Sequence, residues 1–385
     1  MNIVFTGEFT YPDGMAATKR IQNFIDYLTP KVSVKVFLFD QSSAKQPKFV
    51  ENAYRGNVPY TIVGSNISFS LSLLYKVPLS YILSCWYLLK FKIRKERNVL
   101  YVYNGLTIEN IVFVLFAKII GYKIVVEYVE DLRLPSGAIR RGIHIKNQTN
   151  VFFERFIPIL VNGIVVISSY LFSKFEKYNK KVSLIHIPIT AKIPEEDESE
   201  IHEESIFTIA YSGSFGSKDG LETLIEAFKK FAVLHPQSKL LLAGINKNKE
   251  LINKHLTDNK IKYIGYLPDE DFYPFLMKAS TLCITRNKMK FANAGFPFKL
   301  GEYLATGKPV ITSNVSDMEL YIDNYIDAIV VEPESVDQIV DALMFLIKNK
   351  DEAKEIGRRG RLKCKRFFDP EINTTMLLGF LAGLK

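Results

Sequence analysis

The chain has few cysteines, and none is placed to suggest a cross-link or a metal site. Its 385 residues include three, Cys85, Cys283 and Cys364, which are far apart and form no CxxC pair. Closely paired cysteines are the usual sign of a disulfide framework or a zinc site, so we predict neither and expect a reducing cytoplasm. The first residues, Met1 to Phe9, also lack the basic residues and long apolar run of a secretory signal, so we expect no export.

Low-complexity sequence is also absent. Hydrophobic residues make up 48% of the chain and charged residues 24%, which is ordinary globular composition and excludes a largely disordered protein. Because single cores stop growing near ~250–300 residues, a chain of this length should fold as two domains.

Charge is unevenly distributed along the chain. Residues 1–190 carry 24 Lys and Arg against 12 Asp and Glu, a net charge of +12, whereas residues 191–385 carry 26 against 29, a net charge of −3. Net charge acts on association with anions and not on fold, so the basic half points to an anionic partner. The aromatic residues follow core periods and do not alternate with a basic stripe, so nucleic acid is not the expected partner.

Short apolar runs alternate with longer helical patterns in both halves, which predicts an α/β protein with parallel sheets. The acidic stretch within 191–204 cannot be buried and is expected to link two Rossmann-like domains, residues 1–190 and 205–369, with a last helix over 370–385 crossing back to the first domain. The predicted strands are Asn2–Thr6, Val32–Phe39, Val99–Tyr103, Lys123–Tyr128, Gly163–Ile167, Val182–Ile187, Phe207–Tyr211, Lys239–Ala243, Lys262–Tyr266, Thr281–Thr285, Pro309–Thr312 and Ala328–Val331.

Two motifs in the second half follow predicted strands, where parallel sheets bind ligands. The first runs from Tyr211 to Gly220, with glycines that permit close approach of a backbone, the cation Lys218, and a helix start that favours phosphate. The second runs from Ala294 to Val310, where Lys299 near a helix start suits a diphosphate and Glu302 suits two vicinal ribose hydroxyls. A plain glycine turn and solvated helix charges are the alternatives.

The order and spacing of these motifs resemble the donor domain of retaining glycosyltransferases of family 4, which have the GT-B fold. The resemblance covers residues 205–370 and includes Leu242 to Gly244 and Ile264 to Pro268. It implies a nucleoside-diphosphate sugar donor. The resemblance also implies a donor-binding set consisting of Gly14, Gly213, Ser214, Lys218, Gly265, Tyr266, Gly295, Phe296, Lys299 and Glu302. Separately, we predict that no metal cofactor is needed.

Two positions depart from the family pattern. Relatives carry two glutamates eight residues apart, but Ala294 stands eight residues before Glu302, which leaves the donor sugar open. Ser214 stands where many relatives have an arginine, so Lys218, Lys299 and, as the weakest assignment, Arg286 are left to neutralise the diphosphate.

The first half supplies the acceptor side. Gly14 lies in a loop after the first strand and opens a helix, a position suited to phosphate or acceptor. After the strand Lys123–Tyr128, Glu130 and Asp131 stand where many relatives have a His-Asp pair. We predict that Glu130, Asp131 and Lys218 take part in catalysis, the two acids by orienting an acceptor hydroxyl or the donor sugar; a surface ion-pair cluster is the alternative for them.

The stretch Leu71–Lys95 mixes aliphatic and aromatic side chains with five lysines and arginines. This composition suits a helix lying on an anionic membrane, and a buried helix with a basic end fits equally well. Peripheral contact with the inner face of the plasma membrane is therefore a hypothesis.

The predicted reaction moves a sugar, with retention, from a nucleoside diphosphate to a hydroxyl of a glycan or lipid-linked acceptor in polysaccharide or glycolipid assembly. Two other functions remain open: a nucleotide-sugar 2-epimerase, and a non-catalytic sugar-nucleotide-binding subunit. The acidic run Asp269–Asp271 opens a helix, where carboxylates act as dipole partners, so we do not interpret it as a metal site.

Overall fold

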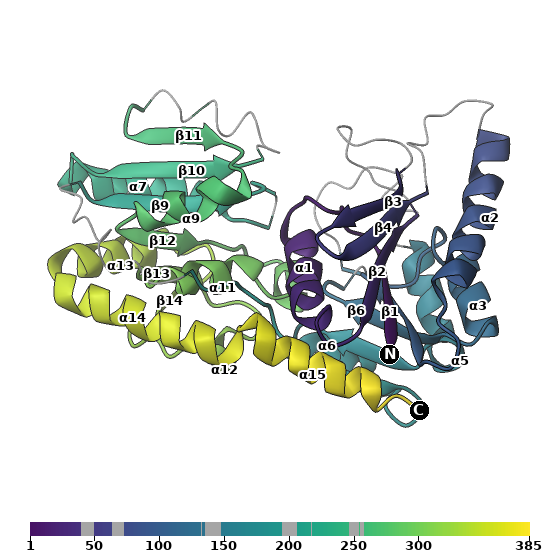
Figure 1. Cartoon of the computed structure of the whole chain (residues 1–385). Helices are drawn as coiled ribbons and strands as arrows, with labels where there is room; N and C mark the ends of the chain where they lie inside the picture. The colour runs from purple at the N-terminus through teal and green to yellow at the C-terminus, as the bar shows by residue number, and fades with distance from the viewer. Residues whose placement is uncertain are drawn as a thin grey trace. The chain divides into compact units, whose positions relative to one another are not determined.

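The computed structural model describes residues 1–39, 50–63, 73–131, 133–134, 148–194, 206–216, 218–245, 254 and 258–385. The chain divides into two compact units (Figure 1). Unit 1 comprises Met1–Pro188 together with Pro370–Lys385, and unit 2 comprises Ile189–Asp369.

Unit 1 is built on an eight-stranded sheet in the order β3-β4-β2-β1-β5-β6-β7-β8. The strands pair in parallel except for β3, which is antiparallel to β4. Their bounds are β1 Asn2–Gly7, β2 Ser33–Leu38, β3 Val50–Arg55, β4 Val58–Ile62, β5 Asn98–Tyr103, β6 Lys123–Tyr128, β7 Gly163–Val166 and β8 Ser183–His186. The central strands β1, β5, β6 and β7 are apolar along nearly their whole length because both faces of a parallel sheet are covered.

The helices of unit 1 pack on this sheet. They are α1 Ala16–Leu28, α2 Leu73–Phe91, α3 Ile111–Ile119, the 3-10 turn η1 Glu154–Phe156, α5 Ile157–Leu160, α6 Ser169–Glu176 and α15 Pro370–Ala382. α15 lies against α1, and its Phe380, with Leu384 beyond it, fills the space over Gly163 of β7. The last residues of the chain are therefore part of the first unit.

Unit 2 contains a six-stranded, all-parallel sheet in the order β11-β10-β9-β12-β13-β14. The strands are β9 Thr208–Gly213, β10 Lys239–Gly244, β11 Ile261–Gly265, β12 Thr281–Ile284, β13 Val310–Ser313 and β14 Ile329–Val331. The helices are α7 Leu221–Leu234, α9 Asp269–Met277, α10 Lys290–Ala294, α11 Phe298–Ala305, α12 Met318–Tyr321, α13 Val336–Lys348 and α14 Lys350–Phe367.

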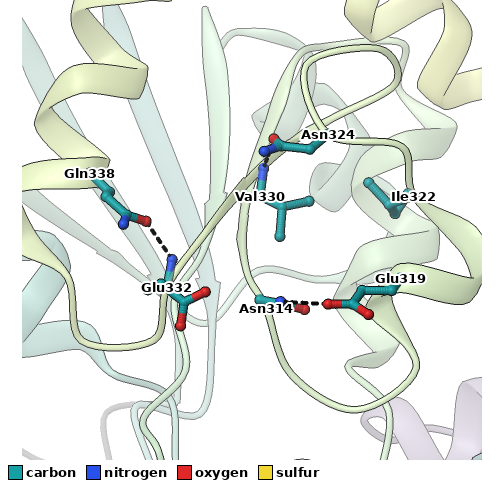
Figure 2. Close-up of a pocket in the computed structure, with 7 residues that line it drawn as sticks. All are labelled: Asn314, Glu319, Ile322, Asn324, Val330, Glu332 and Gln338. Atoms are coloured by element: carbon teal, nitrogen blue, oxygen red, sulfur yellow. Dashed lines mark hydrogen bonds between the residues drawn. The ribbon is translucent and has the colours of Figure 1, made fainter.

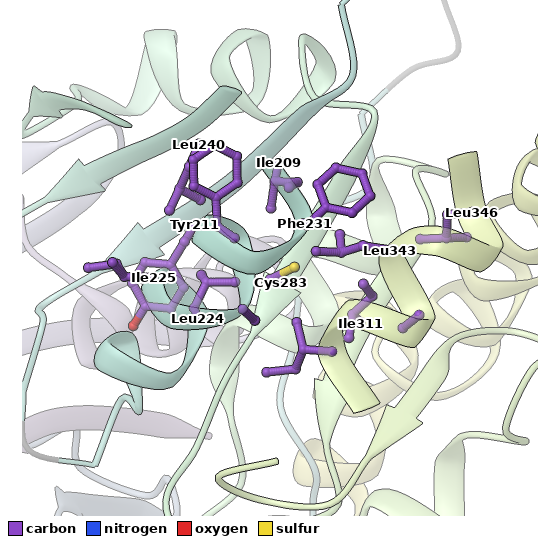
Figure 3. Packing of buried hydrophobic residues seen from close by; sticks show 14 of the residues in the cluster. Ile209, Tyr211, Leu224, Ile225, Phe231, Leu240, Cys283, Ile311, Leu343 and Leu346 are labelled. Carbon is purple, nitrogen blue, oxygen red and sulfur yellow. The ribbon is translucent and has the colours of Figure 1, made fainter. Parts of the chain in front are cut away.

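The core of unit 2 joins α7 and α13 to the sheet (Figure 3). Leu221, Leu224, Ile225 and Phe228 recur at the spacing of one helix face, so α7 buries a continuous apolar stripe. Tyr211 of β9 lies among these side chains and is fully buried, with its hydroxyl at the end of the strand that leads to the first predicted motif.

The predicted α/β class is confirmed, and every predicted strand is present within about two residues of its expected bounds. The hairpin of β3 and β4 was not predicted. Gly56 forms its turn with a φ of 58°, and only short alternating segments flank it, so an edge hairpin gives a weak signal.

The boundary between the units differs from the expected linker at 191–204. Ala191 is buried in unit 2, and its N–H donates to the carbonyl oxygen of Phe368 at 2.9 Å. The acidic residues 195–204 lie outside the described residues.

Candidate functional site

The sheet of unit 2 reverses its direction of growth between β9 and β12. From β9 the chain adds β10 and β11 on one side, then returns to place β12, β13 and β14 on the other. Open α/β sheets bind ligands outside the carboxyl ends of the strands at such a reversal. Gly213 ends β9, and Thr285 and Arg286 follow β12, so these residues mark the candidate site.

Lys299 brings the two predicted motifs together. It lies in the first turn of α11, and its Nζ donates to the Tyr211 hydroxyl at 2.6 Å and pairs with Asp219 Oδ1 at 3.3 Å. Only 17% of its side chain is exposed. Burial lowers the pKa of Lys299 to about 8, although Asp219 acts in the opposite direction. The ammonium group is therefore charged at pH 7 and loses its charge as the pH rises through about 8.

Asp219 holds Lys299 and the glycine loop in place. One of its oxygens accepts hydrogen bonds from the Gly216 N–H at 2.9 Å and from the Ser214 hydroxyl at 3.2 Å, while the other faces Lys299. Burial on its own would raise the pKa of Asp219, but Lys299 and Arg286 hold it well below its usual range. This carboxylate is ionised and its charge is already balanced, so it positions the loop and does not act as a base.

Arg286 contributes a second positive charge at the same place. Only 9% of the residue is exposed, and its backbone N–H donates to the Ser313 hydroxyl at 3.0 Å. Its positive charge lowers the pKa of both Asp219 and Lys299. Its Nε is buried and, among the described residues, has no hydrogen-bond partner. A buried guanidinium donor without an acceptor is costly, and an anion bound at the carboxyl end of β9 and β12 would supply one.

Gly213 makes room for this arrangement. A Cβ atom at this position would collide with the Nζ of Lys299 and would lie 2.7 Å from the Tyr211 hydroxyl. Next to it, the Ser212 N–H donates to the Tyr303 hydroxyl at 2.6 Å, which ties the end of β9 to α11. The predicted close approach at this glycine is thus made by a lysine side chain.

Glu302 lies on α11 one turn after Lys299, and residues three apart on a helix share a face. It is half-buried, and its charge raises the pKa of Tyr273 and Tyr303, after the larger effect of burial. The structure therefore places Glu302 beside the two tyrosines and on the same helix as the cation.

Lys218 lies in the same loop as Asp219, with its Nζ 5.1 Å from the centre of the Phe291 ring. Its positive charge also lowers the pKa of both Asp219 and Lys299. Of the three cations, Lys299 and Arg286 are enclosed, and Lys218 lies at the edge.

The remaining residues of the predicted donor-binding set, Phe296, Gly265 and Tyr266, have different surroundings. Phe296 is buried and packs on Tyr321 and Phe368 with ring centres 5.3 and 6.0 Å away, so its side chain belongs to an aromatic cluster of unit 2. Gly265 ends β11 with a φ of 93° and nothing within 4 Å of its Cβ position, and Tyr266 is 59% exposed. One strand, β10, lies between β11 and β9, so the two strands are two inter-strand spacings, about 10 Å, apart.

In unit 1, Gly14 lies in a turn that two threonines close. A Cβ atom there would collide with the hydroxyl oxygens of Thr10 and Thr18, which lie 3.1 Å apart. Close packing explains this glycine, and the helix α1 begins two residues later without a side-chain cap.

Asp131 and Glu130 have different surroundings. Asp131 is fully buried, pairs with Arg133 at 2.7 Å and with Lys174 at 3.0 Å, and accepts a hydrogen bond from the Tyr170 hydroxyl. Burial would raise its pKa, but Arg133 and Lys174 hold it well below its usual range. Asp131 thus belongs to an ion-pair cluster that is buried, unlike the surface cluster named as the alternative. Glu130 is half-buried. After burial and Glu127, its negative charge also raises the pKa of Tyr103, the last residue of β5.

A separate polar cavity of about 350 Å³ lies at the carboxyl ends of β13 and β14 (Figure 2). Asn314 donates to Glu319 at 3.0 Å, and Gln338 accepts from the Glu332 N–H at 2.7 Å. No predicted residue lines it, and its carboxylates make it unsuitable for a phosphate.

Sequence reasoning overlooked Asp219 and Tyr211 and ranked Arg286 last among the cations. The Lys-Asp-Gly sequence at 218–220 contained the signal for Asp219, since a carboxylate beside a predicted phosphate site needs a cation to balance it. Tyr211 reads as an ordinary strand residue, and only the structure shows that its hydroxyl meets Lys299.

The chain is similar to known glycosyl transferases. Residues 192–363 match the family model of glycosyl transferases group 1. A putative colanic acid biosynthesis glycosyl transferase of Escherichia coli is 29% identical over 39% of this chain and 39% of its own length. Across the curated relatives it matches, the chain spans only 39% to 58% of their length.

Solved structures share the fold over the whole chain. Sucrose-phosphate synthase from Thermosynechococcus elongatus has a TM-score of 0.74 at 14% identity, covering 99% of this chain and 98% of that one. HepE from Anabaena, solved in complex with UDP, has a TM-score of 0.70 at 14% identity with full coverage of both chains. The chain therefore has the GT-B fold of two Rossmann-like domains.

Proposed function

We propose that this protein is a glycosyltransferase that takes a sugar from a nucleoside-diphosphate donor bound in unit 2 and transfers it, with retention, to a hydroxyl of a glycan or lipid-linked acceptor. One observation carries the proposal: Lys299 and Arg286 are enclosed together at the reversal of the sheet, and the Arg286 Nε has no acceptor in the part of the chain that the structure describes. A diphosphate is an anion of the size and charge that this pair fits. The group 1 family match over residues 192–363 supports the same assignment.

In the proposed reaction the bond between the sugar C1 and the diphosphate oxygen breaks, and a bond between C1 and the acceptor oxygen forms. Negative charge develops on the leaving diphosphate, where Lys299, Arg286 and Lys218 stabilise it, and the acceptor proton passes to the diphosphate oxygen or to a carboxylate. Fixed cations placed where charge develops are an effective catalytic device. We propose that they act without a metal cofactor.

Glu130 is the better candidate of the two unit 1 acids for the acceptor side. Both oxygens of Asp131 accept hydrogen bonds from cationic side chains, so this residue positions the loop after β6. Glu130 borders Tyr103 at the carboxyl end of β5, next to the reversal of the unit 1 sheet between β1 and β5.

The nature of the relatives guides the choice of substrates. The E. coli relative is named for colanic acid biosynthesis, and HepE was solved with UDP, so we propose polysaccharide assembly and test uridine nucleotides first. A cytoplasmic location fits a nucleotide-sugar donor.

Glu302→Ala is expected to remove most of the thermal stabilisation that a nucleoside diphosphate gives the wild-type protein. A carboxylate accepting from two ribose hydroxyls makes charge-assisted hydrogen bonds, and losing them weakens binding by about 10- to 100-fold. The measurement is a thermal-shift panel of UDP, GDP and ADP and their sugars, since a ligand of the folded state raises stability by mass action. Glu319→Ala in the separate polar cavity is the matched control, and an equal loss in both variants would contradict the ribose assignment.

The pKa of Lys299 predicts that donor affinity falls on the alkaline side. The lysine is mostly charged at pH 7 and mostly neutral at pH 9, so binding that needs the charge should weaken by up to about tenfold between these values. Isothermal titration with a nucleotide sugar checks this, because its diphosphate diester does not change ionisation over the range. Lys299→Arg keeps its charge throughout and should flatten the profile; the same slope in that variant would point to another group.

Turnover assays separate the proposed activity from the two other functions. A transferase releases nucleoside diphosphate only when an acceptor is present, whereas an epimerase converts the sugar nucleotide with no acceptor. Donor binding with neither reaction would indicate a binding subunit.

A further inference from the structure

Helix α2 exposes an apolar stripe on the side away from the sheet. Leu79, Ile82, Trp86 and Leu89 follow one another at spacings of three, four and three residues, which places them on one helix face. Their exposed fractions are 49%, 66%, 48% and 51%. The same helix buries Tyr87, Leu88 and Phe91, so it is apolar on two sides.

Helix α3 continues this surface. Ile108, Val112, Leu115 and Ile119 recur at spacings of four, three and four residues and are 42% to 81% exposed, while Phe113, Val114 and Ala117 are buried. α2 and α3 pack side by side in unit 1 (Figure 1), and the Tyr81 hydroxyl donates to the Ile108 carbonyl oxygen at 3.2 Å. These eight exposed side chains, seven from the two helices and Ile108 from the turn before α3, form what we call the apolar face.

A surface of this kind needs an explanation. Helices that are apolar all round are normally buried or in contact with lipid, and contiguous exposed apolar patches mark interaction sites. Within the described ranges, no helix is long and apolar enough to span a membrane. An occupant that lies against the outside of α2 and α3 fits both observations.

Positive charge gathers at one end of the apolar face. Residues Lys90–Arg97 contain five lysines and arginines and one glutamate. The Lys92 ammonium donates to the Ile120 carbonyl oxygen at 2.5 Å, which brings the end of α2 beside the end of α3. Lys90 lies 5.0 Å from the Trp86 ring centre, so basic and apolar side chains adjoin. We call residues Lys90–Arg97 the basic end.

We infer that the apolar face and the basic end together form a docking surface for an anionic lipid bilayer. Isoleucine, leucine and tryptophan side chains enter the boundary between headgroups and acyl chains, and lysines and arginines beside them meet the anionic headgroups. A protein partner would account for the apolar face but not for a cluster of positive charges beside it, whereas an anionic bilayer accounts for both. The inference does not depend on the donor site, because lipid binding is measured without nucleotide.

The test is co-sedimentation of the full chain with vesicles of equal parts phosphatidylcholine and phosphatidylglycerol, compared with vesicles of phosphatidylcholine alone. The wild-type protein should bind the anionic vesicles at low salt and less well at high salt, since salt screens the headgroup attraction. I82E/I119E should lower the bound fraction on anionic vesicles by about tenfold or more, because buried apolar contacts are replaced by charges. K90E/R94E should lower binding to anionic vesicles and leave the weak binding to neutral ones unchanged.

V233E/L234E is the matched control, since both residues are exposed, at 76% and 62%, on α7 of unit 2. It should bind like the wild type, and unchanged thermal transitions would show that all variants fold. Equal binding by I82E/I119E and the wild type would overturn the proposal. So would a wild-type dimer, seen by light scattering, that ignores vesicles and dissociates in I82E/I119E, because the occupant would then be a second copy of the chain.

Discussion

Replacing Lys299 with methionine is expected to lower kcat/KM for the sugar donor by about 10²- to 10³-fold. The reason is the loss of a fixed positive charge where the leaving diphosphate gains negative charge, and removing one such stabilising group typically costs this much in rate. Methionine keeps most of the length of the side chain and removes the charge together with the hydrogen bonds to Tyr211 and Asp219. The measurement is steady-state release of nucleoside diphosphate.

The same substitution also affects folding, so a second variant is needed. Lys299→Met leaves Asp219, which is only 3% exposed, without its nearest cation, and an uncompensated buried charge is strongly destabilising. K299M/D219N removes both charges and should recover much of the lost thermal stability while transfer stays slow. If instead the double variant recovered its rate together with its stability, Lys299 would be a structural residue.

The second large effect concerns the buried ion pair of unit 1. Arg20 of α1 pairs with Glu127 of β6 at 2.5 Å, and neither side chain is exposed. The same guanidinium donates to the carbonyl oxygens of Pro188 and Ile187 at 2.5 and 2.9 Å. Arg20→Met should lower the free energy of unfolding of unit 1 by about 3–5 kcal/mol, because Glu127 and two carbonyl groups remain buried without their donors.

Trp86 is the single tryptophan of the chain and lies in unit 1, so its fluorescence during urea denaturation reports on that unit. Arg55→Met is the control, since it removes a partly exposed pair with Asp26 at 3.1 Å and should cost at most about 1 kcal/mol. R20M/E127Q should recover part of the loss. An Arg20→Met variant as stable as the Arg55→Met control would show that water or a neighbour replaces the pair.

Much of this architecture was predictable because parallel strands are short, apolar and separated by helices. The strand Lys123–Tyr128 agrees with its predicted bounds residue for residue, since both faces of the sheet are covered and most of its residues are apolar. Strand β3 escaped notice because an antiparallel edge strand needs no such run. The glycine at position 56 was the one local indication of a hairpin turn, and glycines occur in many other loops.

The site was less predictable than the fold, because it depends on which side chains meet across loops. The helix start and charge of Lys299 were visible in the sequence, but its contact with Tyr211 joins residues 88 positions apart. Arg286 follows a strand, as many surface arginines do. Only the burial of its Nε, which the sequence does not show, distinguishes it from such surface arginines. For Asp131, one of its two cationic partners is Lys174 of α6, 43 residues later in the chain, and no local pattern links the two.

The assignment of Pro370–Lys385 to unit 1 has a practical consequence for dissecting the protein by truncation. Residues 189–369 form unit 2 as one continuous segment, whereas a fragment that stops at residue 188 would lack α15 and leave apolar surface bare on α1 and β7. A truncation that removes residues 370–385 would thus damage the amino-terminal unit first. Affinity tags are for the same reason better placed where they do not disturb Leu384, which is 2% exposed.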